Sequence, residues 1–386
     1  MTIQDSLDTE GVVSTAGTLG RREFVPSADA TVVSRLRAAG AILLGKTNTP
    51  EFTMSYDTRN LVFGFTQNPY DVTKSPGGSS GGAAATIACG GTPFDIGSDT
   101  GGSIRVPSAF CGTAGIKPTS GRVPLTGHII STGLGASDSL TQLGPMARFV
   151  DDLFPLLKII AGVDGQDPAT VPVPLRYPSA VKLSALRVAH HTDNGIIAAS
   201  SDVNRTVRDA VDAVSQTGAS VLESRPQALP KLMDFLYLES AIDGHDWIRQ
   251  LLEKSGTRLW DPHIDWFWEL PPSTSSEAGR ILRDWQRFRI EMLNWFRDFD
   301  VLICPAYAHA SLPSGFEMAG ETLTGFTYTA AFNYTGWPSA VVRCGTSDDG
   351  MPIGVQVVAH PWREDICLAV AKHVETALGG WKQPTI

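Results

Sequence analysis

The sequence lacks a long apolar run. Although 42% of its 386 residues are hydrophobic, no stretch approaches the roughly 20 apolar residues that cross a membrane. It also lacks a cluster of Lys and Arg, and its formal charge is −9. A charge of this sign disfavours nucleic acid and anionic membranes as main partners. What remains is the composition of a soluble globular protein with a large core, and small molecules are its expected partners.

Metal and redox motifs are missing as well. The eight histidines show no HExxH or similar ligand spacing, so we predict no metal site. The cysteines are odd in number and have no CxxC spacing, which indicates buried thiols in a reducing, cytoplasmic environment. They are Cys89, Cys111, Cys304, Cys344 and Cys367. No cofactor-binding motif is present, and we expect no cofactor.

Two glycine-serine clusters stand out between Ser75 and Ser108. The first, GGSSGG at residues 77–82, gives the backbone freedom to bend tightly and to bring its amides close to a ligand. The alanines that follow predict a helix of small residues. Residues 93–97 predict a short buried strand that delivers the second cluster, 98–103. Consecutive N–H groups in such a turn can converge on one point, as an oxyanion hole requires.

Flexible linkers and phosphate-binding loops are the alternative interpretations of such clusters. A linker would not come as a pair. A P-loop needs Gly-Lys-Ser/Thr after its turn, and a dinucleotide site needs GxGxxG between strand and helix, but neither pattern occurs here.

Residues 75–119 resemble the signature region of the amidase signature family of serine hydrolases, and residues 45–52, 68–71, 333–338 and 350–356 extend the resemblance. Members of that family hydrolyse amides with a Ser-Ser-Lys triad. By resemblance, Ser103 is the nucleophile and Ser79 the bridging serine, which follows a cis peptide bond at Gly78–Ser79. The backbone amides of Thr100, Gly101, Gly102 and Ser103 match the oxyanion hole.

The third member of the triad departs from the family pattern. The family's lysine lies in a strand motif that here spans residues 3–11, and its position holds Gln4. Neither Lys46 nor Lys74 occupies the matching position. A glutamine amide has no accessible basic state, and general base catalysis contributes about 10² to 10⁴ in rate, so we expect hydrolysis to be strongly impaired.

The start of the chain also differs from the family, whose members carry helices ahead of this strand. Three explanations stay open: a chain shortened or re-coded for study, a gene model that misses its true start, and a naturally decayed amidase. Absent helices would leave apolar surface uncovered, which predicts self-association, for example as a homodimer.

The substrate pocket is expected from two parts of the chain. Met54, Ser55 and Tyr56 lie where the family often contacts substrate, although simple packing is an alternative for Met54 and Tyr56. Gly78, Ser80 and Asp99 complete the predicted substrate-binding set. The segment 229–298 is helical and rich in aromatics, and its irregular run 260–272 is a candidate pocket wall for a bulky apolar or aryl acyl group.

The implied fold is α/β, with a single domain over residues 1–386 in which a large mixed, twisted sheet lies between helical layers. Its core is 1–162 and 299–386, and 229–298 is a variable region on the substrate side. Local patterns predict a helix capped by Asp29, a strand at 41–44, a helix at 148–162, a parallel βαβ unit over 186–222 and a strand at 299–305. In 281–295, apolar residues recur at helical spacing, which predicts a helix that buries one stripe.

The predicted function is hydrolysis of carboxamides, extending to anilides, esters and carbamates (a urethanase activity), through a Ser103 acyl-enzyme. One alternative is a catalytically silent ligand-binding protein that keeps the pocket without the base. The other is a glutaminase-type subunit of a tRNA-dependent amidotransferase, which the aromatic segment disfavours because glutamine is small and polar.

Overall fold

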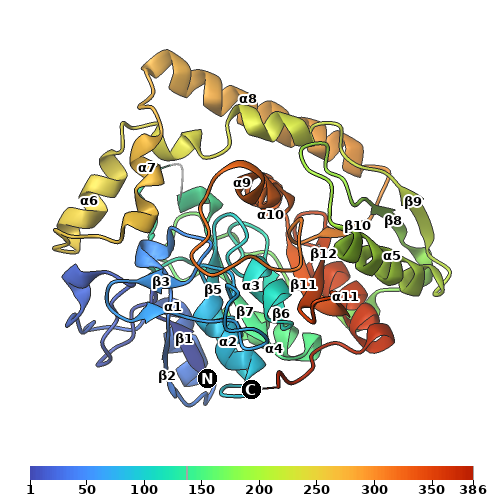
Figure 1. The fold of residues 1–386 in the computed structure, drawn as a ribbon, viewed down its shortest axis with the longest axis horizontal. Coiled ribbons are helices and arrows are strands. Elements are labelled where there is room, and N and C mark those ends of the chain that lie inside the picture. The colour runs from blue at the N-terminus through green and yellow to red at the C-terminus, as the bar shows by residue number, and fades with distance from the viewer. Residues whose placement is uncertain (136–137, 386) are drawn as a thin grey trace.

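The computed structural model describes residues 1–135 and 138–385, and its centre is a mixed sheet of eight strands in the order β5-β7-β6-β11-β12-β10-β8-β9 (Figure 1). Neighbouring strands run antiparallel from β5 to β10, and β10-β8 and β8-β9 are parallel. The strands of this sheet are β5 (Phe94–Asp99), β6 (Ala114–Lys117), β7 (Gln142–Ala147), β8 (Arg187–His190), β9 (Ser220–Glu223), β10 (Val301–Pro305), β11 (Ser339–Thr346) and β12 (Pro352–Ala359).

Helices cover both faces of the sheet, as the sequence predicts. Because side chains alternate along a strand, β12 packs Val355 and Val357 on one face and Val358 on the other. The first face is covered by α1 (Thr31–Ala38), α4 (Val150–Ile160), α5 (Ser201–Ser215) and α11 (Glu364–Leu378). The second is covered by α2 (Gly81–Ala88), α3 (Arg105–Phe110), α8 (Ser275–Phe296) and α10 (Thr327–Tyr334).

The predicted parallel βαβ unit is confirmed. Strand β8 pairs in parallel with β9, and α5 connects them. This helix buries Val203, Val207 and Val214, which follow one another at helical spacing, against the sheet.

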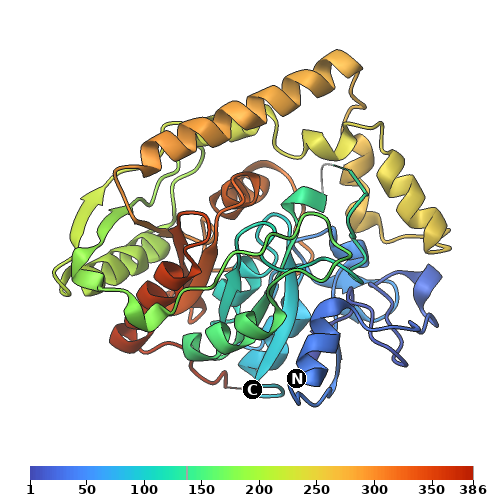
Figure 2. The ribbon, with the colours of Figure 1, turned by 180° about the vertical axis from the view of Figure 1, so that it is seen from behind.

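The long helix α8 confirms the predicted apolar stripe. It crosses the upper side of the molecule in both views and buries Ile281, Trp285, Phe288 and Met292 (Figures 1 and 2). The same region contains α6 (Asp246–Lys254) and α7 (Trp266–Glu269), which lie beside the N-terminal part of the chain. A short helix, α9 (Gly320–Gly325), precedes α10.

Two local predictions were wrong. No strand forms at 41–44; instead β2 (Gly45–Thr47) pairs in parallel with β1 (Thr2–Gln4), and Ile42 and Leu44 are exposed. Residues 42 and 44 are nevertheless bonded to the residue before β1, because the Met1 N-terminal amine donates to the Ile42 carbonyl at 2.6 Å and the Leu44 N–H donates to the Met1 carbonyl at 2.8 Å. Asp29 does not cap α1, because the N-cap residue is Ala30. The Asp29 carboxylate instead accepts from the Glu10 N–H and forms an ion pair with Arg37. A small hairpin forms separately, in which β3 (Arg59–Asn60) pairs antiparallel with β4 (Gly64–Phe65).

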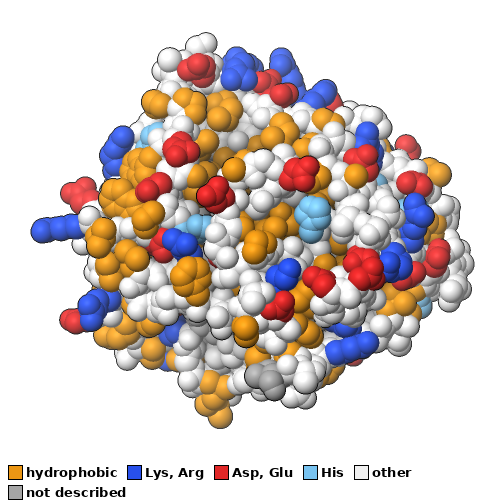
Figure 3. All heavy atoms as spheres, in the orientation of Figure 1, with side chains coloured by type: hydrophobic (Ala, Val, Ile, Leu, Met, Phe, Trp, Pro, Cys, Tyr) orange, Lys and Arg blue, Asp and Glu red, His pale blue; other side chains and the backbone are white. Residues whose placement is uncertain are grey.

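Apolar side chains also reach the surface. Figure 3 shows them gathered over the left side of that view, the side of α6 in Figure 1. Strongly exposed apolar residues of the first 72 positions include Ile42, Leu44, Phe63, Phe65 and Val72. The homodimer stays a prediction.

No helix among the described residues is both long and apolar enough to cross a membrane.

The five cysteines are free thiols, and four of them are buried as predicted. Cys89 is exposed, contrary to the prediction, because it follows directly after the last residue of α2, where the chain turns at the surface.

Candidate active site

The two glycine-serine clusters lie against each other, because the Ser80 N–H donates to the Ser103 carbonyl oxygen at 3.1 Å. The first cluster leads into α2 and the second connects β5 to α3. The Gly78–Ser79 peptide bond is cis, as predicted. Gly78 must be a glycine, because a Cβ there would lie 2.7 Å from the backbone carbon of Tyr56.

Asp99 holds the second cluster in place through hydrogen bonds to its backbone. Its buried carboxylate accepts from the backbone N–H of Gly102 at 2.9 Å and of Ile104 at 3.1 Å, and from the Arg105 guanidinium at 2.8 and 3.0 Å. Asn333 on α10 donates to the same carboxylate at 2.9 Å. Burial favours the neutral acid, but Arg105 and these donors hold the pKa of Asp99 below its usual range. The charged carboxylate therefore fixes the course of the loop.

This geometry leaves only some loop amides available for an oxyanion. Gly102 N–H is committed to Asp99, whereas Gly101 N–H and Ser103 N–H have no partner within the described residues. The Thr329 hydroxyl donates to the Gly101 carbonyl at 2.7 Å, which fixes the orientation of that peptide. Gly102 has a φ of +140° and its Cβ would meet Thr329 Oγ1 at 2.3 Å, so both the conformation and the space require glycine.

Gln4 occupies the centre of a buried ring of hydroxyl groups. Its Nε2 lies 3.2 Å from Thr49 Oγ1, 3.2 Å from Ser80 Oγ and 3.4 Å from Ser79 Oγ. Its Oε1 accepts from two further serines, Ser6 at 3.0 Å and Ser98 at 2.9 Å. The side chain is fully buried. The glutamine amide thus satisfies donors and acceptors around the first cluster without carrying charge.

A bridging role for Ser79 predicts a hydrogen bond between the Ser79 and Ser103 hydroxyls, but the hydrogen bonds of the described residues do not include it. Ser79 Oγ is instead approached by Gln4 Nε2. Ser79 is fully buried, and Ser103, which is 6% exposed, lines a cavity.

Three lysines of the described residues make their polar contacts away from Ser79 and Ser103. Lys46 Nζ donates to backbone and hydroxyl oxygens within residues 7–14, and burial lowers its pKa to about 8. Lys117 Nζ donates to the Pro118 carbonyl, and burial lowers its pKa to about 7. Lys74 pairs with Asp349 near the surface. None of these three has a hydrogen bond to either serine among the described residues.

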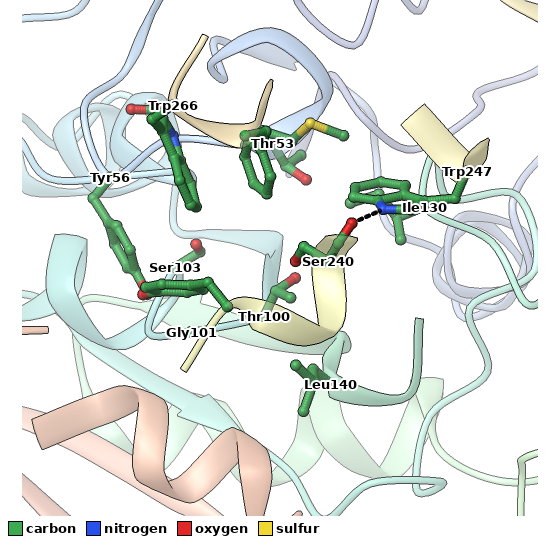
Figure 4. A pocket seen from close by; sticks show the side chains of 14 residues that line it. Thr53, Tyr56, Thr100, Gly101, Ser103, Ile130, Leu140, Ser240, Trp247 and Trp266 are labelled. Carbon is green, nitrogen blue, oxygen red and sulfur yellow. Dashed lines mark hydrogen bonds between the residues drawn. The ribbon is translucent and has the colours of Figure 1, made fainter. Parts of the chain in front are cut away.

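Next to Ser103 is a cavity of about 60 Å³. Figure 4 shows Ser103, Thr100 and Gly101 on one side of it and Trp266 and Thr53 on the other. Its remaining lining residues are Met54, Ser55, Tyr56, Ile130, Leu140, Tyr237, Ser240, Trp247 and Phe267. The predicted wall from 260–272 is present through Trp266 and Phe267.

Tyr56 and Tyr237 close one side of this cavity. Their hydroxyls are 2.8 Å apart, and the Tyr56 ring stacks on Phe326 with centroids 3.7 Å apart. Gly101 lies so close that a Cβ there would be 2.0 Å from the Tyr56 hydroxyl. Burial, and next the neighbouring Tyr237, raise the pKa of Tyr56 well above its usual range, so it is a neutral phenol.

The predicted site residues thus separate into two groups. Met54, Tyr56, Thr100, Gly101 and Ser103 line the cavity, whereas the others lie behind it. Those others are Gln4, Gly78, Ser79, Ser80, Asp99 and Gly102. Sequence reasoning missed Tyr237, Thr53 and Asn333. The left-handed φ of Thr53, +62°, leaves no trace in the sequence, and Asn333 was noted only as part of a family motif.

A serine hydroxyl beside two unpaired backbone N–H groups, over a mostly apolar cavity, is the arrangement of a serine hydrolase. Comparison with known families agrees with it: the family model described as Amidase matches residues 1–368. The chain belongs to the amidase signature family, whose members act on C–N bonds.

The chain is similar to two amidotransferase subunits in sequence and to two solved hydrolase structures in fold. The chain is 34% identical to a glutamyl-tRNA(Gln) amidotransferase subunit of Thermus thermophilus over 99% of this chain and 85% of that protein. The Acaryochloris marina protein of the same name is 33% identical over 96% and 82%. The structure of 6-aminohexanoate cyclic dimer hydrolase with its substrate superposes with a TM-score of 0.87 and 29% identity, covering 100% of this chain and 86% of that one. A bacterial aryl acylamidase, at 24% identity and a TM-score of 0.84 over 97% and 81%, shares the fold.

Among the described residues, no group of three or more His, Cys, Asp and Glu side chains is placed to hold a metal ion.

Proposed function

We propose that this chain is a carboxamide hydrolase in which Ser103 forms the acyl-enzyme, with anilides, esters and carbamates as further substrates. The observation that carries the proposal is the position of Ser103 beside Gly101 N–H and Ser103 N–H at the edge of the cavity. An acyl carbonyl in the cavity would be within reach of both the nucleophile and the two donors.

The proposed role of Asp99 and Asn333 is to position this loop rather than to bind substrate. The Asp99 carboxylate accepts from the Gly102 N–H, and Asn333 donates to the Asp99 carbonyl. In the proposed arrangement, the N–H groups of Gly101 and Ser103 remain available for an oxyanion. Loss of one oxyanion-hole donor costs about 10² to 10³ in rate, so a loop that shifts would be costly.

We further propose that Gln4 makes acylation slow. Attack by Ser103 requires that its proton leave, and the proposed route runs through Ser79 to the side chain at position 4. The amide of Gln4 can donate and accept hydrogen bonds but cannot take up this proton. Its central place in the hydroxyl ring supports a structural contribution that keeps the first cluster ordered.

We also propose that residues 1–386 form one domain. Support comes from the cavity, which combines the loop after β5 with Tyr237, Trp247 and Trp266 from the variable region 229–298. A site shared in this way needs both parts of the chain.

An assay with an acyl p-nitroanilide tests the function. We expect slow release of p-nitroaniline by the purified chain and none by the Ser103→Ala variant, which keeps the cavity. A rate that is equal in both proteins would show that Ser103 is not the nucleophile. Mass spectrometry after reaction with an aryl fluorophosphonate provides a second measurement: we expect slow covalent labelling at Ser103 and none in the Ser103→Ala variant, because labelling needs the nucleophile but no acyl turnover.

A glutaminase-type subunit is the second candidate function, and the 34% identity to the Thermus protein favours it. The cavity argues against it, because no charged side chain among its described lining residues could pair with the α-carboxylate and α-ammonium groups of glutamine. Release of ammonia from glutamine, measured against release from an apolar primary amide, separates the two functions. A silent ligand-binding protein would bind amides and release nothing.

A further inference from the structure

The cavity wall opposite Ser103 holds two buried polar atoms without partners. The Thr53 hydroxyl and the Trp266 indole N–H are both buried, and neither has a hydrogen-bond partner in the part of the chain that the structure describes. Thr53 is 7% exposed. An unsatisfied buried group of this kind costs about 1 to 3 kcal/mol, and native proteins keep few of them.

Other tryptophans of the same region donate their indole N–H to an acceptor within the protein. The Trp247 indole N–H donates to the Ser240 carbonyl at 2.6 Å, and that of Trp285 donates to the Tyr334 carbonyl at 2.7 Å. Trp260, in the same segment as Trp266, donates to Asp265 at 2.8 Å.

The backbone at Thr53 is held in a conformation that its side chain disfavours. Phe52 and Thr53 have φ values of +52° and +62°, and a β-branched residue in this left-handed region is a genuine outlier. Strain of this type costs of the order of 1 to 3 kcal/mol and tends to persist at ligand-binding sites. The strained backbone turns a polar group onto the cavity wall, where a simple core would have placed an apolar one.

We propose that Thr53 and Trp266 form a polar subsite that binds a hydrogen-bond acceptor on the acyl group of the substrate. This inference rests on the proposed function and narrows its substrate class. The acyl group is apolar where it passes the aromatic side chains and carries a second carbonyl or ether oxygen at its far end. That oxygen accepts from the Trp266 indole N–H and the Thr53 hydroxyl, across the cavity from Gly101 and Thr100 (Figure 4).

A matched pair of primary amides tests the subsite. Levulinamide carries a ketone oxygen on its acyl chain, whereas valeramide has the same chain length without it, and the small NH₂ group leaves only the acyl chain to fill the cavity. We expect levulinamide to bind roughly fivefold to tenfold more tightly in isothermal titration calorimetry, which corresponds to one net hydrogen bond. Binding is measured on the chain with Gln4 in place, so the result does not depend on turnover.

Variants assign the preference to the two side chains. Trp266→Phe keeps an aromatic ring but removes the donor, and Thr53→Val keeps the β-branch but removes the hydroxyl. Each is expected to lower the ratio of levulinamide to valeramide affinity to twofold or less, and measuring both amides on the same variant cancels the effect of altered packing, which both share. Thr53→Ser should retain the preference, and so should Trp260→Phe, a control in the same segment outside the cavity lining.

Equal affinities for the two amides would overturn the inference, and so would binding of neither amide or a preference that survives both Trp266→Phe and Thr53→Val. A failure of the proposed function has a different signature. In that case no amide is hydrolysed and no acyl-enzyme forms, even where levulinamide binds with the expected preference.

Discussion

Replacement of Gln4 by lysine is the most direct test of how this site works. Lysine is one bond longer than glutamine, so its Nζ extends beyond the present position of Gln4 Nε2, which already lies 3.4 Å from Ser79 Oγ. The expected N–O distance then falls within the range of an ordinary hydrogen bond. Because the position is fully buried, desolvation lowers the pKa of the new lysine toward neutral pH, and the neutral amine can accept a proton.

We expect Gln4→Lys to raise amide hydrolysis by at least about 10²-fold, the lower range for gaining a general base. The rate should rise with pH as the lysine loses its proton, with a midpoint below the value of about 10.4 for a free lysine. The substitution also has a structural cost, because Ser6 and Ser98 lose Gln4 Oε1 as their acceptor. Two lost hydrogen bonds of about 1 kcal/mol each predict a less stable protein.

The assay is release of p-nitroaniline over a pH series, with stability measured in parallel by denaturant unfolding. Gln4→Met, of similar length but without a base, separates the gain in basicity from a change in packing. Ser103→Ala in the lysine background should abolish the gain, and Ser79→Ala should remove most of it. A Gln4→Lys protein that folds and binds amides but hydrolyses them no faster would refute the proposed proton path.

Two further predictions concern buried charges. Burial raises the pKa of Asp95 from 3.8 to about 6, so between these pH values the folded protein binds more protons than the unfolded chain. The protein therefore loses up to about 3 kcal/mol of stability as pH rises through this range. Asp95→Asn should lack this loss when urea unfolding is compared at pH 4 and pH 7, and an unchanged pH dependence would contradict the prediction. His191 is buried with both ring nitrogens unpartnered among the described residues, and burial lowers its pKa to about 3, so stability falls as pH drops below about 6.5. His191→Phe should therefore raise the melting temperature, more at pH 5 than at pH 7.5, and an equal shift at both would argue against protonation as the cause.

The sequence predicted those parts of the site that depend on local backbone geometry. A tight turn of Gly, Ser and Asp residues after a buried strand can adopt few backbone conformations. In the loop after β5, the Asp99 carboxylate accepts from the backbone N–H groups of residues 102 and 104. Its role as an anchor could also have been read from the sequence. Aspartate at the start of a turn commonly accepts from backbone N–H groups a few residues later.

The other wall of the cavity was beyond local reasoning. Tyr237 meets Tyr56 across 181 residues of sequence, and its place depends on how the aromatic region folds back over the sheet. Composition identified the segment 260–272 as a wall but could not distinguish Trp266, whose N–H is unpaired, from Trp260, whose N–H is bonded. At 41–44 the apolar residues predicted a buried strand, but Ile42 and Leu44 are exposed, and apolar composition alone could not show that their side chains face away from the core.

Binding and proton transfer are physically separable in this site, and Gln4 is the reason. The hydrogen bond from Ser80 N–H to the Ser103 carbonyl and the anchoring of the loop by Asp99 involve neither a lysine nor the side chain of residue 4. A buried lysine would have to be neutral or paired to sit among the hydroxyls of Thr49, Ser79 and Ser80, whereas the glutamine amide meets them at no cost in buried charge. The fold around Ser103 is therefore formed without a charged side chain at position 4, and ligand binding can be measured on this chain independently of any proton transfer.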